Sequence, residues 1–187
     1  MSENRSALLV MDYQHANVEG VATPEVRAAG AKALATAREK GLPVIFVRVG
    51  FRPGYPEVAA ANQTFSGVKA NAGEAMWQDS PGTQVHADFA PQDGEPVVVK
   101  RRISAFTGGD LDVLLRGAGA DTLVMAGLTT SGVVLSTLRQ AADLDYRSVV
   151  LSDACADPDP QIQEVLMEKI FPRQAKVITT DEWVSSL

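Results

Sequence analysis

Short apolar runs alternate with amphipathic segments along most of the chain. Most of these runs are continuous in Val, Leu, Ile and Ala rather than alternating with polar residues, which is typical of strands that helices cover on both faces. On this basis the sequence predicts six buried strands, at Ala7–Met11, Pro43–Val49, Pro96–Lys100, Thr122–Ala126, Ser148–Leu151 and Ala175–Ile178.

The segments between these strands carry helix signals. Pro24–Glu39 follows Thr23, a residue type that caps helices, and Gly41 comes after it as a stop. Ser131–Leu144 repeats its apolar residues with the spacing of one helical face. The remaining predicted helices are Gly109–Arg116, Gln161–Phe171 and Thr180–Ser186.

This alternation predicts an α/β fold. We expect three layers, α/β/α, around an open, six-stranded, mostly parallel, doubly wound sheet, formed by residues 1–187 as one domain. The segment Gly50–Ala90 interrupts the alternation and is rich in Gly, Pro, Asn and Gln. We interpret it as a long excursion over the sheet edge, of the kind that often forms a lid or a binding loop. In such sheets a ligand binds beyond the carboxyl ends of the strands.

The composition narrows the possible partners. Lys and Arg number 17 against 23 Asp and Glu, for a formal charge of −6. This balance argues against a nucleic-acid or membrane partner but leaves room for a small anionic substrate. The chain has one cysteine and therefore no intrachain disulfide, and its first apolar run is too short for a signal-peptide core or a membrane span. We expect a cytoplasmic protein that acts on a small molecule.

Charged residues stand at the ends of two predicted strands. Asp12 comes directly after Ala7–Met11, and Lys100 is the last residue of Pro96–Lys100. Because a buried charge is costly unless it is paired, the two side chains are expected to form an ion pair in a cleft. An ordinary salt bridge at the sheet edge, or a helix N-cap, fits the same pattern.

A third feature is the turn from Ala126 to Gly132, which leads from a strand into a helix. Backbone N–H groups at such a helix start can bind an anion or an oxyanion. The glycine spacing does not match a dinucleotide fingerprint, and the lysine of a P-loop is missing. Many turns of this kind hold glycine only for conformational reasons.

Taken together, these segments resemble the isochorismatase-like cysteine hydrolases. The similar stretches are Ala7–Gln14, Pro81–Thr83, Val97–Lys100 with Ser104–Phe106, Val124–Val133 and Asp153–Ala156, and the resemblance runs from about Ser6 to the C-terminus. It implies a hydrolase whose catalytic residues are an aspartate, a lysine and a cysteine, so that Asp12 and Lys100 carry over as catalytic residues. It also implies a cis peptide bond between Leu128 and Thr129.

The chain departs from this pattern at the third catalytic position. The family turn reads G-x-x-T-x-x-C, and counting from Gly127 puts Val133 at the place of the cysteine. Valine has no thiol, so the covalent route is closed. Cys155 follows the next strand and is interpreted as an inert buried thiol, and Ser131 has no histidine base near it in the sequence.

Some isochorismatases of the family also lack the cysteine and have glycine in its place. Their reaction cleaves an enol-pyruvyl ether to a diol and pyruvate: an acid protonates the vinyl carbon and water adds to the resulting cation. By resemblance Asp12 is that acid, and a substrate carboxylate bound to Lys100 would leave burial to raise the pKa of Asp12. Here glycine stands one place early, at Gly132, so Val133 should leave less room for substrate than glycine would.

Further residues are candidates for the substrate pocket. They comprise polar side chains near strand ends, aromatic residues that could wall the pocket, and residues of the turn after the fourth strand: Gln14, Arg48, Phe51, Trp77, Phe106, Leu128, Thr129 and Gly132. The two histidines, His15 and His86, do not form the Asp/His/His cluster of metal-containing nicotinamidases. We therefore predict no metal and no cofactor.

Three functions fit these residues. The leading prediction is a hydrolase that acts on a small anionic metabolite by non-covalent acid catalysis. One alternative is an amide or imide hydrolase in which Asp12 activates water, and another is a catalytically inactive member that binds a metabolite or a protein partner. Because members of the family usually assemble, we also expect a homo-oligomer, a dimer or a tetramer.

Overall fold

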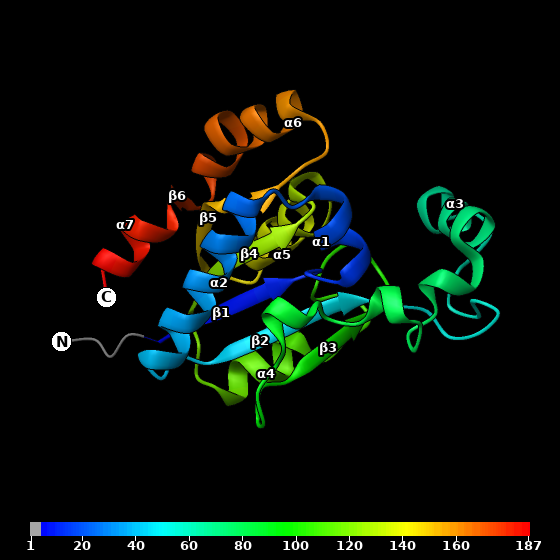
Figure 1. The fold of residues 1–187 in the computed structure, drawn as a ribbon, viewed down its shortest axis with the longest axis horizontal. Coiled ribbons are helices and arrows are strands. Elements are labelled where there is room, and N and C mark those ends of the chain that lie inside the picture. Colours follow the sequence, from blue (N-terminus) through cyan, green and yellow to red (C-terminus); the bar gives the residue numbers. More distant parts are fainter. Residues whose placement is uncertain (1–4) are drawn as a thin grey trace.

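A parallel sheet forms the centre of the molecule. In a computed structural model, which describes residues 5–187, the strands are β1 (Ser6–Met11), β2 (Val44–Val49), β3 (Val97–Lys100), β4 (Thr122–Leu128), β5 (Arg147–Ala156) and β6 (Lys176–Ile178). Within these residues they form one six-stranded sheet in the order β3-β2-β1-β4-β5-β6, and every neighbouring pair is parallel (Figure 1). The predicted open α/β sheet is confirmed, and every predicted strand has its counterpart.

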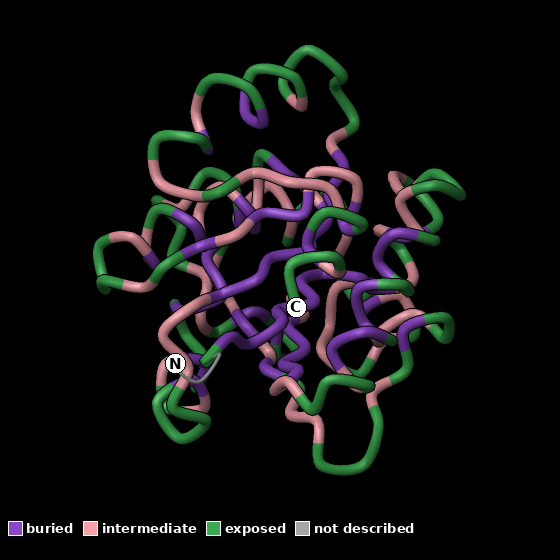
Figure 2. The backbone as a smooth tube through the Cα atoms, turned by 90° about the vertical axis from the view of Figure 1, so that its left-hand side faces the viewer, coloured by how far each residue is buried: buried purple, intermediate pink, exposed green. Residues whose placement is uncertain are grey.

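Helices cover both faces of the sheet. They are α1 (His15–Val21), α2 (Pro24–Glu39), α3 (Gln63–Ala72), α4 (Leu111–Gly117), α5 (Leu135–Asp143), α6 (Pro160–Val165) and α7 (Thr180–Ser185). Side chains of α4 and α5 pack on one face, and those of α2 and α7 on the other. Figure 2 shows the buried backbone through the middle of the molecule and the exposed segments around it.

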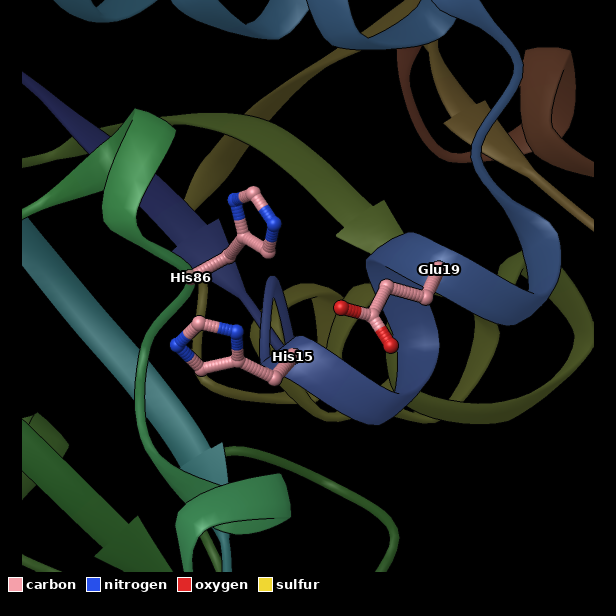
Figure 3. Close-up of side chains that lie close together, drawn as sticks. All are labelled: His15, Glu19 and His86. Carbon is pink, nitrogen blue, oxygen red and sulfur yellow. The ribbon is translucent and has the colours of Figure 1, made fainter.

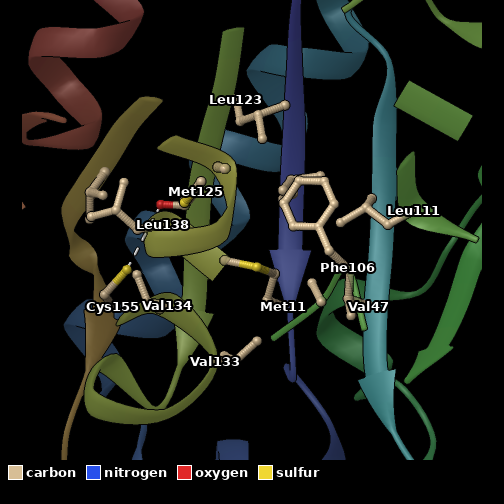
Figure 4. Packing of buried hydrophobic residues seen from close by; sticks show 14 of the residues in the cluster. Met11, Val47, Phe106, Leu111, Leu123, Met125, Val133, Val134, Leu138 and Cys155 are labelled. Atoms are coloured by element: carbon tan, nitrogen blue, oxygen red, sulfur yellow. Dashed lines mark hydrogen bonds between the residues drawn. The ribbon is translucent and has the colours of Figure 1, made fainter. Parts of the chain in front are cut away.

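The central strand β1 contributes to both hydrophobic cores. Ala7, Leu9 and Met11 belong to one core and Leu8 and Val10 to the other, because successive side chains of a strand point to opposite faces. All five are at most 3% exposed. The uninterrupted apolar run of β1 is therefore buried on both faces of the sheet. Figure 4 shows the core on the face to which Met11 belongs.

Several element boundaries differ from the prediction. The helix predicted at Ser131–Leu144 begins with a π-helical turn, Thr130–Val134, before α5, and the one predicted at Gln161–Phe171 is divided into α6 and a π-helical turn, Leu166–Ile170. Neither α1 nor α3 was predicted, because neither has a clear apolar repeat. No helix within residues 5–187 is long and apolar enough to cross a membrane.

The excursion after β2 is ordered by its own small core. It contains α3 and three 3₁₀ turns, Gly73–Met76, Pro81–Thr83 and Ala87–Phe89. Phe51, Tyr55 and Phe65 pack together. Glu57 ties the excursion to the chain after β3, because its carboxylate lies 2.7 Å from the Nε of Arg101. In Figure 1, α3 stands to the side of the sheet, beyond the carboxyl ends of the strands.

Candidate active site

An ion pair lies at the carboxyl edge of the sheet. Lys100 Nζ is 2.9 Å from Asp12 Oδ2, and the two side chains are 3% and 8% exposed. The strands that carry them are not neighbours, since β2 lies between β1 and β3, but parallel strands end at the same edge. Asp12 has a φ of 56°, in the left-handed region, and its N–H donates to the carbonyl of Val47 at 2.7 Å. This turn directs the carboxylate across β2 toward the lysine.

The carboxyl group of Asp12 is only half satisfied. Its Oδ2 faces Lys100, whereas its Oδ1 is buried and has no hydrogen-bond partner. Burial raises the pKa of Asp12 above its ordinary value, and Lys100 opposes this shift without cancelling it. Lys100 Nζ also donates to the carbonyl of Arg102 at 3.2 Å. An unpartnered buried carboxylate oxygen is costly in a folded protein unless a ligand uses it.

The turn after β4 closes the other side of the site. The peptide bond between Leu128 and Thr129 is cis, and the π-helical turn Thr130–Val134 follows. At Gly132 a side chain would meet the hydroxyl of Thr129, since a Cβ there would lie 2.8 Å from Oγ1. Val133 is 2% exposed and is part of the core under α5.

These residues surround a cavity of about 190 Å³. Its lining is mostly apolar and has few polar groups: Asp12, Asn17, Val49, Phe65, Val68, Met76, Lys100, Ile103, Leu128, Thr129, Gly132 and Val133. Asn17 Nδ2 donates to the carbonyl of Asp12 at 2.9 Å and to that of Leu128 at 3.4 Å, and so links the two walls. A small apolar cavity with a buried charge pair suits a small molecule with a polar reacting group.

A larger hollow, of about 510 Å³, lies at the opposite ends of β2 and β3. Two of its charged residues are already paired, because Arg38 holds Glu95 through both carboxylate oxygens at 2.7 and 2.8 Å. The pair lowers the pKa of Glu95, chiefly through the hydrogen bond from Arg38. Because this larger hollow lies away from the carboxyl ends of the strands and none of its lining residues has a buried unpartnered side-chain atom, we take the smaller cavity as the candidate active site.

Five of the predicted pocket residues do not line this cavity. Gln14 is a structural residue: its Nε2 donates to the carbonyls of Val49 and Thr83 at 2.9 Å each, and its Oε1 accepts the N–H of Val49 at 2.8 Å. Arg48 donates to the carbonyl of Gln78 at 2.7 Å. Both residues were predicted to line the pocket because they lie near a strand end. That position does not determine toward which side of the sheet the side chain points.

The three aromatic candidates belong to cores. Phe51 is fully buried in the core of the excursion, and Trp77 packs against that core. Phe106 is in the core beneath α4 and α5. The apolar wall of the cavity is instead formed from the excursion by Phe65, Val68 and Met76. The sequence offered no signal for these three, because neither α3 nor the 3₁₀ turn after it was predicted. Asn17 was missed because α1 was not predicted.

Neither alternative nucleophile reaches the cavity. Cys155 is on β5, its Sγ is 3.8 Å from the carbonyl oxygen of Met125, and burial raises the pKa of its thiol to about 12 (Figure 4). Ser131 is exposed, and its N–H donates to Asp157 at 2.8 Å. No described residue that lines the cavity carries a thiol.

The two histidines are brought together although they are far apart in the sequence. His15 begins α1, His86 precedes the turn Ala87–Phe89, and their ring centroids are 4.7 Å apart. With Glu19 they form a group whose possible ligand atoms all lie within 4.8 Å of one another (Figure 3). This group could not be predicted from the sequence, because only the fold places these three residues side by side.

The open parallel sheet, with a carboxylate and a lysine facing a small cavity at its carboxyl edge, has the architecture of α/β proteins that bind small molecules at the strand ends. The isochorismatase domain model matches residues 6–182. The chain belongs to the isochorismatase family of hydrolases, as its motifs indicated.

Relatives with stated activities and solved structures agree with this family. The chain is 31% identical to a ureidoacrylate amidohydrolase of Pseudomonas syringae, over 100% of this chain and 82% of the relative. An isochorismatase family protein from Burkholderia thailandensis has a similar structure, with a TM-score of 0.86 and 28% identity over 99% of this chain and 96% of the other. The N-carbamoylsarcosine amidase from Thermoplasma acidophilum is also similar, with a TM-score of 0.76 and 27% identity over 95% and 97% of the two chains.

Proposed function

We propose that this protein hydrolyses a C–N bond of a small amide or ureido compound without a covalent enzyme intermediate. The observation that supports this most directly is the free, buried Oδ1 of Asp12 in the cavity beside Lys100. The names of two similar proteins, an amidohydrolase and an amidase, favour a C–N bond over the enol-pyruvyl ether that was expected from sequence.

In the proposed mechanism Asp12 is the general base. Its free oxygen accepts a proton from a water molecule, which adds to the substrate carbonyl carbon. The C–N bond then breaks, and the nitrogen leaves with the proton that Asp12 took up. Lys100 lowers the cost of charge in the cavity and attracts an anionic substrate. Val133 takes the place of a nucleophile and fills space.

The raised pKa of Asp12 favours one second candidate, cleavage of an enol-pyruvyl ether. In that reaction a protonated Asp12 gives its proton to the vinyl carbon, and water adds to the cation. A carboxyl group that holds its proton to higher pH than usual is suited to this role. Val133 narrows the space for such a substrate.

The two candidates are distinguished by product and by pH. Two products are measured: ammonia or an amine released from small amides and ureides, and pyruvate released from isochorismate. Each assay compares the native chain with Asp12→Asn, and Asp143→Asn, at an exposed aspartate, is the matched control. Amide hydrolysis should rise with pH through the pKa of Asp12, because the base must be ionised, and ether cleavage should fall. Activity that Asp12→Asn retains would contradict both mechanisms.

A further inference from the structure

The backbone brings His15 and His86 together beside an isolated β-bridge. Gln14 and Val85 form an antiparallel bridge, flanked by hydrogen bonds from His86 N–H to the carbonyl of Tyr13 at 2.9 Å and from His15 N–H to that of Gln84 at 3.1 Å. Side chains next to a bridged pair point to the opposite face from it. Gln14 is therefore directed inward, and the two histidines lie together on the other side.

Glu19 completes this cluster from α1. It is four residues after His15, so the two side chains share one face of the helix. Both histidines are half-buried and Glu19 is exposed. Figure 3 shows the two rings and the carboxylate turned toward a common space. Two imidazoles and one carboxylate, supplied by two separate segments, thus converge at the surface.

We propose that His15, Glu19 and His86 bind a divalent transition-metal ion of the zinc class. Bonds of about 2.0–2.2 Å from zinc to histidine nitrogen and carboxylate oxygen need the ligand atoms closer to one another than the full 4.8 Å. A modest rotation of the exposed Glu19 side chain and of the rings closes this difference, and water completes the coordination. Imidazole and carboxylate ligands suit zinc and its neighbours rather than magnesium or calcium.

Asp88 orients one of the rings. The Asp88 N–H donates to His86 Nδ1 at 3.2 Å, and the Asp88 carboxylate lies 3.5 Å from the same nitrogen. The Nε2 of His86 is therefore the nitrogen left for the metal. On binding, the ring proton moves from Nε2 to Nδ1, which then gives up the hydrogen bond from the Asp88 N–H and donates one to the Asp88 carboxylate, an arrangement that commonly supports metal-ligating histidines.

Such a metal would fasten the excursion to the segment that carries Asp12. His86 belongs to the last part of the excursion, and His15 follows Asp12 by three residues. The ion would act on the position of the active-site turn rather than on the substrate. The expected result of binding is a more stable protein.

Zinc binding to the untagged chain tests the proposal. Calorimetric titration with Zn²⁺ should give one site per chain, which is lost in His15→Ala and in His86→Asn and weakened about 10–100-fold in Glu19→Gln. Glu39→Gln, at an exposed glutamate on α2, and Cys155→Ser are controls that should bind as the native chain does. With zinc at 100 times the Kd, the Tm should rise by roughly 5–10 °C in the native chain and not in His15→Ala.

The visible absorption of bound Co²⁺ tests the same site independently. Co²⁺ bound by imidazole and carboxylate should show visible bands without the strong thiolate charge-transfer band that Cys155 would produce. Absence of zinc binding, or binding that both histidine variants retain, overturns the proposal, as does a thiolate band. Far-UV circular dichroism of each variant separates loss of the site from loss of the fold.

Discussion

Asp12 and Lys100 are coupled because each is buried and each is the other's ionic partner. Removing one partner of a buried pair leaves an uncompensated charge, which costs more than the pair itself contributes. Because of this coupling, a single substitution at either position does not measure how much the ion pair contributes to stability. The coupling also means that loss of activity in a single variant must be separated from loss of stability.

We expect Lys100→Met to lower the free energy of unfolding by about 3–5 kcal/mol, because Asp12 is then buried without a cation. Adding Asp12→Asn should restore most of this loss. Urea unfolding of the native chain, both single variants and the double variant at pH 7 measures the coupling. A double variant that is no more stable than Lys100→Met would contradict it.

The raised pKa of Asp12 also predicts a pH dependence of stability. Because the folded state holds this proton more tightly than the unfolded chain, whose value is near 3.8, Asp12 stabilises the fold below that pH. This contribution is lost as pH rises through the folded pKa. Asp12→Asn should therefore gain stability relative to the native chain as pH is raised from 4 toward 7, in thermal unfolding at each pH. A constant difference would argue against the shift.

Replacing Val133 by cysteine should place a reactive thiol in the cavity. In Val133→Cys, made together with Cys155→Ser, the new thiol lines the cavity near Lys100, whose charge favours the thiolate. We expect iodoacetamide to add one label to this variant, detected by mass spectrometry. The native chain should stay unlabelled while folded, since its one thiol is buried. An unlabelled Val133→Cys variant would mean that this position does not face the cavity.

At the scale of helices and strands, a close contact near the site joins β4 to the turn before α5. A Cβ on Gly127 would lie 2.6 Å from Val134 Cγ2 and 3.4 Å from the Cβ of Met11. The absence of a side chain at Gly127 thus lets the turn approach β1, and Val133 of this turn lines the cavity.

We expect Gly127→Ala to destabilise the protein by about 1–3 kcal/mol, because the new methyl group overpacks the core. Gly117→Ala is the matched control, since a Cβ there meets nothing within 4 Å. Guanidinium unfolding of the two variants measures the difference. Equal effects would show that the turn can shift freely.

The strands were predictable because their residues are apolar without interruption, and Asp12 and Lys100 because a charge that ends such a run is conspicuous. The turn that holds Leu128, Thr129 and Gly132 was also predicted, but the wall that the excursion contributes to the cavity was not. Phe65 and Met76 reach it from α3 and from the turn after it, whose sequences have no strong period. Gln14 and Arg48 are near the strand ends as expected, but their hydrogen bonds to backbone carbonyls hold them in structural positions. A linear pattern does not determine such partners.

Across the chain as a whole, the excursion is the part least supported by the sheet. Its α3 contributes to the cavity but stands apart from both cores (Figure 1). The predicted homo-oligomer stays a prediction, and light scattering tests it. A neighbouring subunit against α3 would protect this segment.

In limited proteolysis, the first cleavage should fall within the excursion. We expect trypsin to cut after the exposed Lys69 while the sheet stays intact, because few buried contacts hold α3. A ligand in the cavity should slow this cut, since Phe65 and Val68 line it. Mass spectrometry of the fragments identifies the site. A first cut within the strands or α5 would contradict the expectation.

The order of the strands in the sheet has a consequence for synthesis on the ribosome. β1 is made early but lies between β2 and β4, and the cavity needs Asp12, Lys100 and Val133 together. At the usual rate of elongation, roughly 6–24 s pass between the synthesis of Asp12 and that of Val133. A nascent chain that ends before Val133 therefore has no binding site, and no metabolite can assist its folding until most of the message has been translated.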